Sequence, residues 1–586
     1  MKRSHLPASL PDAVTSRRRF LTSAGVLAAG SALRPVAALP DPLDAHRLTP
    51  GAPPASAFRP DLTVEDLAHA EAVQGLSFTD ADRQLMLEDV TDRLEQLAQI
   101  RDAEPPNGVP PALILDLSLS GDTRPGPGPG PSIPVLGARP RPADDRDLAF
   151  ASIPELGAML RSGAVTAVGL AEFFLGRLRQ FDPVLKAVVT LTEARALETA
   201  RARDAELAAG VDRGPLHGIP WGAKDLLAAR GYPTTWGAEP FREQIIDADA
   251  TVVRRLDEAG AVLVAKLTLG ALAWGDVWFG GRTNSPWNVD EGASGSSAGP
   301  GAAVAAGLVP FAIGSETLGS IVSPSTRNGV TGLRPTTHRV PTTGAMALSW
   351  SMDKLGPMTR SAVDAALVFD AIRGPETGED AAFPFDPVAP LSDLRVGTLV
   401  PADGDGEGAE ADRQTVEVLR QLGVRPVEVA LPEDLPVGAL SVILEAEAAA
   451  AFDGLTRSRG TDRMVRQERN AWPNSFRAAR FIPAVEYINA NRIRTQLMRA
   501  MADLMSEIDV LVAPSFGNAG LLITNLTGHP AVAIPNGLFP VEGFADRRRP
   551  HSITFVGPLW GEHHALRLAH AVQEATDWHR QRPPVG

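Results

Sequence analysis

Two segments built from small residues constrain this chain more than any other part of it. Residues Gly295–Gly307 read GSSAGPGAAVAAG, and residues Gly314–Ser325 read GSETLGSIVSPS. Such segments let backbone N–H groups approach other atoms closely, because glycine, alanine and serine have small side chains or none. Glycine–serine runs are often linkers, but these two are bordered by residues typical of an apolar helix and strand. We therefore expect both segments inside a folded domain.

One lysine and two serines stand in order along these motifs. Lys224 lies in GIPWGAKD at Gly218–Asp225, and Ser296 and Ser320 lie in the two small-residue segments. A serine is a poor nucleophile until a base takes its proton, and a buried lysine can be that base because burial disfavours its charged form. The trio predicts an acyl-transfer site. The residues alone leave open a structural ion pair between Lys224 and Asp225.

From about Asp147 onward, helical and strand-like segments alternate. This alternation predicts an α/β fold in which helices cover both faces of a sheet. An acidic stretch, Asp403–Glu410, is expected to be an exposed loop. The predicted helices are Ser152–Asp182, Glu193–Leu207, Thr251–Ala259, Gly299–Ala306 and Phe476–Ile508, and the predicted strands are Ala187–Leu191, Ala261–Lys266, Phe311–Gly314 and Val510–Ala513.

The first residues have the pattern of an export signal. A basic stretch, Ser16–Leu21, precedes a short apolar stretch, Leu21–Leu33, and the small-residue segment Pro35–Ala38. This resembles a twin-arginine signal, which is an address for the export machinery and not an anchor. The apolar stretch is too short to span a bilayer. We expect an exported protein, periplasmic or secreted, without a stable membrane anchor.

Composition divides the remaining chain. Residues 39–122 are predicted to be a mainly helical extension, with helices over Leu62–Gln74 and after a capping box at Thr79–Asp82. The second of these helices carries apolar residues at helical spacing from Leu85 onward, which indicates docking on a larger body. Residues 123–146 form a Pro/Gly-rich linker or extended strap, and residues 147–586 form the catalytic domain.

Charge and cysteine content exclude several classes of protein. The net charge of −14 disfavours a nucleic-acid binder, which would show a basic surface. The absence of cysteine excludes a disulfide framework, a thiolate nucleophile and a cysteine-ligated metal. Histidines 551, 563 and 564 lack a neighbouring carboxylate on a clear helical face, so we expect no metal site there.

Several long motifs resemble the amidase signature family. They occur in the family's order and cover the chain from about Asp147 to its C-terminus. The resemblance implies the amidase-signature fold, a large mixed and twisted sheet. The motifs are GIPWGAKD at 218–225, DATVVRRLDEAGAVLVAK at 249–266, SPWN at 285–288, the segment 292–336, DKLGPMTRS at 353–361 and NLTGHPAVAIPNG at 525–537.

The resemblance also implies roles for single residues. Ser320 matches the nucleophile, Ser296 the bridging serine and Lys224 the catalytic lysine. In the implied mechanism, Ser320 attacks an amide carbonyl while its proton passes through Ser296 to neutral Lys224 and then to the leaving amine. An acyl-enzyme forms and water hydrolyses it. No metal or other cofactor is implied, and the expected partner is a small-molecule amide.

The turn before the nucleophile matches the family's oxyanion hole. Its backbone N–H groups belong to Thr317, Leu318, Gly319 and Ser320. Leu318 stands where glycine is common in the family, and Val322 stands where arginine is common. Leu318 therefore puts the pocket shape in doubt more than the chemistry. The resemblance further implies a cis peptide bond between Gly295 and Ser296, and we expect Ser297 to support Ser296 by hydrogen bonding.

Other functions remain open at the level of sequence. One is the glutaminase subunit of a tRNA-dependent amidotransferase. Another is an esterase of the α/β-hydrolase type, with Ser297 as nucleophile in a G-x-S-x-G pattern. That pattern needs a preceding strand, and we expect Asn288–Ser294 to be a poor one. A third is a non-catalytic binding protein on the same fold.

Two further lysines receive structural interpretations. The S-x-x-K pattern at Ser351–Lys354 lacks the companion motifs of penicillin-recognising enzymes. Lys266 is expected to be ion-paired or to reach the surface. The predicted function is therefore a metal-free serine amidase, with esters or carbamates as additional substrates. The sequence leaves open the substrate, the role of the extension and whether the chain forms a homodimer.

Overall fold

The structure is a computed structural model that describes residues 62–586, except 104–105, 110–112, 377–379 and 433. The export signal predicted over residues 1–38 lies outside the described residues. Of the helices that are described, none has both the length and the apolar content needed to cross a membrane.

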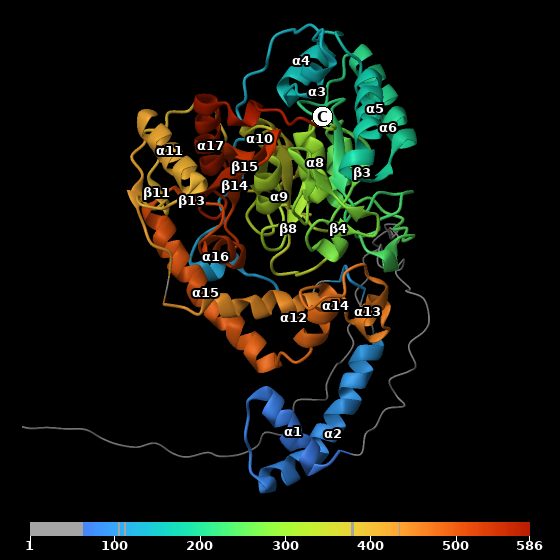
Figure 1. Cartoon of the computed structure of the whole chain (residues 1–586), viewed down its shortest axis with the longest axis vertical. Helices are drawn as coiled ribbons and strands as arrows, with labels where there is room; N and C mark the ends of the chain where they lie inside the picture. The colour runs from blue at the N-terminus through green and yellow to red at the C-terminus, as the bar shows by residue number, and fades with distance from the viewer. Residues whose placement is uncertain (1–61, 104–105, 110–112, 377–379, 433) are drawn as a thin grey trace, which may run out of the picture. The chain divides into compact units, whose positions relative to one another are not determined.

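An eleven-stranded mixed sheet organises the chain after residue 187 (Figure 1). The strand order is β1-β3-β2-β8-β10-β9-β14-β15-β13-β11-β12. Strand β2 is parallel to β3 and β8, and β11 is parallel to β12 and β13. The other neighbours are antiparallel. The strands are β1 (Val188–Leu191), β2 (Pro220–Lys224), β3 (Val262–Leu267), β8 (Phe311–Glu316), β9 (Thr331–Arg334), β10 (Lys354–Thr359), β11 (Val396–Thr398), β12 (Val427–Glu428), β13 (Val510–Pro514), β14 (Ala531–Val541) and β15 (Phe544–Val556).

Helices flank this sheet, so the α/β class and the amidase-signature fold are confirmed. Helices α8 and α9 pack against central strands, and α10 and α17 pack on each other and on β10 and β14. The helices from residue 145 onward are α3 (Asp145–Ala149), α4 (Ile153–Arg161), α5 (Ala167–Leu185), α6 (Glu193–Ala208), α7 (Thr251–Glu258), α8 (Ala298–Ala305), α9 (Val322–Asn328), α10 (Ala362–Ile372), α11 (Glu407–Gln421), α12 (Val442–Ala451), α13 (Asp453–Arg457), α14 (Trp472–Ala479), α15 (Ala484–Glu507), α16 (Gly520–Thr527) and α17 (Glu562–Thr576).

Local sequence explains where several of these elements begin. A capping box formed by Ser152 and Glu155 starts α4, and the hydroxyl of Thr166 caps the first turn of α5. Strand β2 is buried along its whole length, as expected for a central parallel strand covered on both faces. The ring of Trp221 in β2 stacks on Phe311 in β8 with centroids 6.0 Å apart, which packs these two strands together.

Two sequence expectations are wrong in detail. The segment Asp403–Glu410 is not loop throughout, because α11 begins at Glu407. Gly406 has a φ of 97°, which lets the chain turn there, and Glu407 and Glu410 lie in the first turn, where acidic groups favour the helix dipole. Residues Asn288–Gly292 do form a strand, β7, which pairs with β6 (Asn284–Ser285) in a small separate sheet. A second small sheet pairs β4 (Val277–Trp278) with β5 (Gly281–Arg282).

The described part of the N-terminal extension contains helices α1 (Val64–Gln74) and α2 (Asp80–Ala103), as predicted. Thr63 and Asp66 form a capping box for α1, and Thr79 and Asp82 form the equivalent one for α2. The apolar side of α2 is less covered than its spacing predicts, since Leu85 is 80% exposed. Short 3₁₀ helices complete the described chain at Leu117–Ser120, Glu239–Phe241, Ala271–Ala273, Val437–Ser441, Gly460–Arg463 and Trp578–Arg580.

The Pro/Gly-rich segment after this extension has neither helix nor strand over residues 123–142. Its backbone nevertheless bonds to residues 382–385. Ala382 N–H donates to Gly126 O at 3.0 Å, Phe383 N–H donates to Pro129 O at 3.1 Å, and Ser132 N–H donates to Phe385 O at 2.7 Å. This segment is therefore an extended strap held along residues 382–385.

Candidate active site

Lys224 is the last residue of β2 and is fully buried. Its Nζ lies 2.8 Å from Ser296 Oγ, 2.8 Å from Ser315 Oγ, 3.0 Å from Ser297 Oγ and 3.3 Å from Ser315 O. Among the described residues it forms no salt bridge. Burial lowers the pKa of Lys224 well below its ordinary value, and the negative charges of Asp353 and Glu316 oppose this only in part. The amine is therefore set up to be neutral.

Ser296 and Ser297 stand just before α8. The peptide bond between Gly295 and Ser296 is cis, as the resemblance implies. A Cβ atom at position 295 would lie 1.8 Å from Gly275 O, so only glycine fits there. Ser297 does not bond to Ser296, contrary to expectation. Its Oγ contacts Lys224, donates to Ser315 O at 3.1 Å and accepts from Ser315 N–H at 3.1 Å, so Ser297 supports the lysine instead.

Ser320 lies in the turn that joins β8 to α9, and it is 8% exposed. Ser297 N–H donates to Ser320 O at 3.2 Å, which joins the backbones of the two serine segments. The Ser320 hydroxyl has no hydrogen-bonding partner among the residues that the structure describes. The structure thus brings Ser296 into contact with Lys224 and places the Ser320 segment beside it, while Ser320 itself does not contact the lysine.

The turn before Ser320 presents unused backbone donors. The N–H groups of Leu318, Gly319 and Ser320 donate to no other group in the described part of the chain. Gly319 has a φ of 80°, a value that favours glycine. The Leu318 side chain is 37% exposed, so it stands at the opening of the turn and leaves the backbone donors unblocked by a hydrogen bond.

Glu316 fixes the other side of this turn. Its carboxylate accepts from Ile321 N–H at 2.8 Å, Val322 N–H at 3.0 Å, Arg334 Nη1 at 2.8 Å and Asn525 Nδ2 at 2.8 Å. Burial opposes the ionisation of Glu316, but the Arg334 guanidinium and the backbone donors outweigh it and lower its pKa to about 2. The first N–H groups after Ser320 are therefore held by a carboxylate that stays ionised.

The alternative structural interpretations can be compared with the same geometry. Asp225 pairs with Lys266 at 2.6 Å and not with Lys224, so the prediction that Lys266 is ion-paired is confirmed. In the S-x-x-K pattern, Ser351 donates its hydroxyl to Glu447 at 2.7 Å while Lys354 Nζ donates to Met352 O. Strand β7 ends at Gly292, outside the main sheet, which is not the strand that an α/β-hydrolase nucleophile requires.

The described residues contain no group of three or more histidine or acidic side chains that could hold a metal ion. Burial lowers the pKa of His529 to about 3 and that of His563 to about 3. His551 Nε2 lies 3.1 Å from Asp412 Oδ1, where it packs between β15 and α11. These histidines have structural surroundings, and the catalytic roles available to the site fall to the lysine and the serines.

A cavity of about 330 Å³ lies against both serine segments. Ser294 and Ser323 line its inner wall, with their Oγ atoms 2.8 Å apart. Ser294 precedes Ser296 by two residues, and Ser323 N–H donates to Gly319 O one turn after the nucleophile position. The rest of the wall is formed by Thr326, Arg327, Glu407, Gly408, Phe516, Phe539, Arg549, Pro550 and His551.

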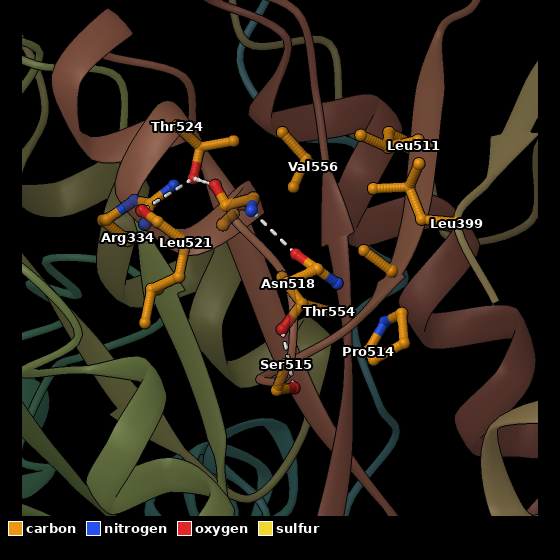
Figure 2. A pocket seen from close by; sticks show the side chains of 13 residues that line it. Arg334, Leu399, Leu511, Pro514, Ser515, Asn518, Leu521, Thr524, Thr554 and Val556 are labelled. Carbon is orange, nitrogen blue, oxygen red and sulfur yellow. Dashed lines mark hydrogen bonds between the residues drawn. The ribbon is translucent and has the colours of Figure 1, made fainter. Parts of the chain in front are cut away.

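A second cavity, of about 20 Å³, lies between α16 and β13 (Figure 2). Arg334, Leu521 and Thr524 face it from one side, and Leu399 and Leu511 face it from the other, as Figure 2 shows. This volume suits a water molecule and little more. A small-molecule substrate therefore fits the larger cavity.

Comparisons with known proteins agree with this geometry. The sequence model of the Amidase family matches residues 169–541. A glutamyl-tRNA(Gln) amidotransferase subunit from Halorhodospira halophila is 33% identical over 491 residues, which cover 74% of this chain and 98% of that protein. The corresponding protein from Dechloromonas aromatica is 32% identical over 490 residues, covering 74% and 99%.

Solved structures give the same result. The peptide amidase from Stenotrophomonas maltophilia superposes with a TM-score of 0.64 at 28% identity, covering 74% of this chain and 98% of the amidase. The chain therefore belongs to the amidase family of amide-hydrolysing enzymes.

Sequence reasoning missed three residues around the site. Ser315 contacts Lys224 from β8, Glu316 holds the N–H groups after Ser320, and Asp353 accepts the Thr317 hydroxyl at 2.5 Å. Glu316 and Asp353 both lie within the motifs that carry the family resemblance. An acidic residue inside an otherwise small or apolar motif was the available signal, because a buried carboxylate needs several donors.

Proposed function

We propose that this chain hydrolyses carboxamides through an acyl-enzyme, with Ser320 as nucleophile, Ser296 as proton relay and Lys224 as base. The observation that carries the proposal is the surroundings of Lys224. The amine is fully buried, lies 2.8 Å from Ser296 Oγ and has no carboxylate partner among the described residues. A buried amine without a counter-charge favours its neutral form, which is the form that accepts a proton.

Counting donors around the amine supports the relay. A neutral amine has two N–H donors and one lone pair, yet three hydroxyls and one carbonyl surround Nζ. One hydroxyl must therefore donate to the lone pair. Ser297 already donates to Ser315 O, so the donor is Ser296 or Ser315. Ser296 is the one whose neighbour, Ser297, bonds to the Ser320 backbone.

Each step then balances its protons. Ser320 Oγ bonds to the amide carbonyl carbon while its proton moves to Ser296 and the Ser296 proton moves to Lys224. Collapse of the tetrahedral intermediate breaks the C–N bond, and the same route returns the proton to the leaving amine. Water then attacks the acyl-enzyme, giving the carboxylic acid and free Ser320.

The unused N–H groups of Leu318, Gly319 and Ser320 suit the oxyanion of this intermediate. One such donor typically lowers the barrier by about 3 kcal/mol. No metal is needed for this chemistry, since the donors and the base come from the chain. The cavity beside Ser294 and Ser323 is proposed to take a small-molecule amide, and the signal-like N-terminus leads us to propose that the enzyme is exported.

The test is a substrate screen of the purified protein against aryl, aliphatic and peptide amides, esters and carbamates. Ser320→Ala should lower turnover of any active substrate by about 10⁶-fold while the thermal unfolding curve stays in place. Mass spectrometry of the native enzyme should detect an acyl group on Ser320. EDTA treatment serves as the control and should leave the rate unchanged. Normal turnover by Ser320→Ala would overturn the assignment.

A second candidate function rests on the 33% identical relative from Halorhodospira halophila. That protein is a component of a glutamyl-tRNA(Gln) amidotransferase, which suggests a glutaminase that delivers ammonia within a complex. We expect this chain to hydrolyse other carboxamides without added subunits. Glutamine as the sole substrate, hydrolysed only in the presence of partner subunits, would favour the second function.

A further inference from the structure

Asn107, in the turn Pro106–Val109 of the N-terminal extension, bonds to the catalytic domain. Its Nδ2 donates to Ala347 O at 2.8 Å and its Oδ1 accepts from Ala347 N–H at 2.8 Å. Trp350 Nε1 also donates to Asn107 O at 3.3 Å. A side-chain amide that satisfies both polar groups of one peptide fixes the position of that peptide as a neighbouring strand would.

The segment that follows Asn107 is itself anchored. Leu115 and Leu117 are buried in a small cluster with Met498 of α15 and Leu559. Apolar burial of this kind is the usual reason that a chain segment outside a sheet keeps one position. Asn107 is therefore held beside residue 347 by more than its own hydrogen bonds.

The loop that Asn107 holds contacts Asp353. Leu348 N–H donates to Asp353 Oδ2 at 2.7 Å, and Ser349 N–H donates to the same oxygen at 3.0 Å. Asp353 forms no salt bridge within the described residues, and the neighbouring Lys354 directs its amine to Met352 O. The carboxylate thus acts as a hydrogen-bond acceptor between elements and not as one half of an ion pair.

The other oxygen of Asp353 reaches the oxyanion turn. Thr317 Oγ1 donates to Asp353 Oδ1 at 2.5 Å. Thr317 directly precedes the three residues whose N–H groups are unused, so its position sets the direction of those donors. An oxyanion hole loses much of its effect when its donors are misplaced, because its advantage is that they are already oriented.

We propose that Asn107, the loop 347–350 and Asp353 form one positioning chain that orients the oxyanion turn through Thr317. The N-terminal extension then takes part in catalysis from outside the segment that matches the family, residues 169–541. Asn107 and Asp353 act through other residues and are positioning residues. The inference rests on the proposed function, because it assumes that the turn binds an oxyanion.

The first experiment compares Asn107→Ala with Asn489→Ala, an asparagine that lies exposed on α15. Asn107→Ala should lower kcat about fivefold with little change in KM, since the substrate cavity is not lined by this chain of contacts. The Asn489→Ala control should match the native enzyme. An unchanged kcat in Asn107→Ala, with the native unfolding temperature, would overturn the role of Asn107.

The second experiment tests whether the contacts act as one chain. Thr317→Val removes the hydroxyl at constant shape and should lower kcat about 10- to 100-fold, whereas Thr317→Ser should recover most of that loss. Combined with Asn107→Ala, Thr317→Val should cost less than the product of the two single effects, because both break the same connection. Fully multiplicative effects would show independent roles and overturn the proposal.

A pH profile separates positioning from charge. Asp353→Asn removes a negative charge that raises the pKa of Lys224, so the acid limb of kcat/KM should move to lower pH. Asn107→Ala changes no charge, so its profile should keep the native limb at a reduced height. If Asn107→Ala moved the limb, its effect would be electrostatic and the positioning chain would be wrong.

Ser320→Ala distinguishes the two levels of the argument. Native activity in Ser320→Ala would remove the proposed function and this inference together. An inactive Ser320→Ala with native activity in both Asn107→Ala and Thr317→Val would remove only the inference.

Discussion

Two fully buried lysines lie on neighbouring parallel strands of this protein and have opposite surroundings. Lys266, on β3, has a carboxylate 2.6 Å from its amine, supplied by Asp225. Lys224, at the end of β2, has only hydroxyls and a carbonyl around its amine. The same residue type at the same depth is therefore one half of an ion pair in one place and a candidate base in the other.

Strand geometry produces this difference. The register pairs Ala223 with Lys266 and Lys224 with Leu267, so the two lysine side chains point to opposite faces of the sheet. Asp225 follows Lys224 in the chain and points to the other face, where it meets Lys266. A carboxylate next to a lysine in sequence is thus not its partner in an extended strand. The partner, and not burial alone, decides what a buried amine can do.

The largest expected effect comes from replacing the unpaired lysine. Lys224→Met keeps the length of the side chain and removes the base, so kcat/KM should fall by about 10⁴-fold. The unfolding temperature should stay the same or rise, because no buried charge is left without a partner. Steady-state kinetics and thermal unfolding check both parts. A strongly destabilised Lys224→Met would mean that Lys224 resembles Lys266 after all.

Lys266→Met should give the opposite pattern. It leaves the Asp225 carboxylate buried without its counter-charge, which should lower the free energy of unfolding by about 3–5 kcal/mol. Denaturant unfolding measures this loss. Below the unfolding transition, the folded fraction should keep its kcat. A specific loss of kcat at full folding would place Lys266 in the reaction and break the contrast.

The pH dependence sharpens the contrast further. Only neutral Lys224 accepts a proton, and burial lowers its pKa, so activity should be full above that pKa and fall as the pH drops through it. The fall should be about tenfold per pH unit. A kcat/KM profile checks this, with Lys266→Met as the control that should keep the same limb. A flat profile down to about pH 4 would contradict a lysine base.

The smallest expected effects concern the hydroxyls around each amine. Ser297→Ala removes a partner of Lys224 and should lower kcat about tenfold, while Thr234→Val removes a partner of Lys266 at 3.1 Å and should cost about 1 kcal/mol of stability. Kinetics and denaturant unfolding of the pair should show this crossed pattern. Equal kinetic losses in both variants would contradict it.

Local signals in the sequence predicted much of the fold. Capping residues such as Thr79 located helix starts, and the apolar stretch Ala261–Lys266 predicted β3. The start of α11 was missed because an acidic run has no apolar spacing, although its charges suit a helix N-terminus. The order of Lys224, Ser296 and Ser320 also predicted which residues the fold brings to one place.

The contacts that orient the site could not be predicted in the same way. Ser315 lies in β8, which is buried along its whole length, so no alternation shows which face its side chain takes. The pairing of Asn107 with Ala347 joins positions 240 residues apart, and nothing local in either segment encodes it. The motifs thus identify chemical groups, while their directions come from contacts between remote segments.

The strap over residues 126–132 has a practical consequence for handling the protein. A protease that cuts between Ser132 and the start of α3 would leave two fragments still connected by the backbone hydrogen bonds at Ala382, Phe383 and Phe385. The fragments should migrate together on a sizing column and separate only in denaturant. A chain trimmed to start at residue 147 would instead expose Ala382, now 2.7 Å from where a Cβ on Gly128 would lie.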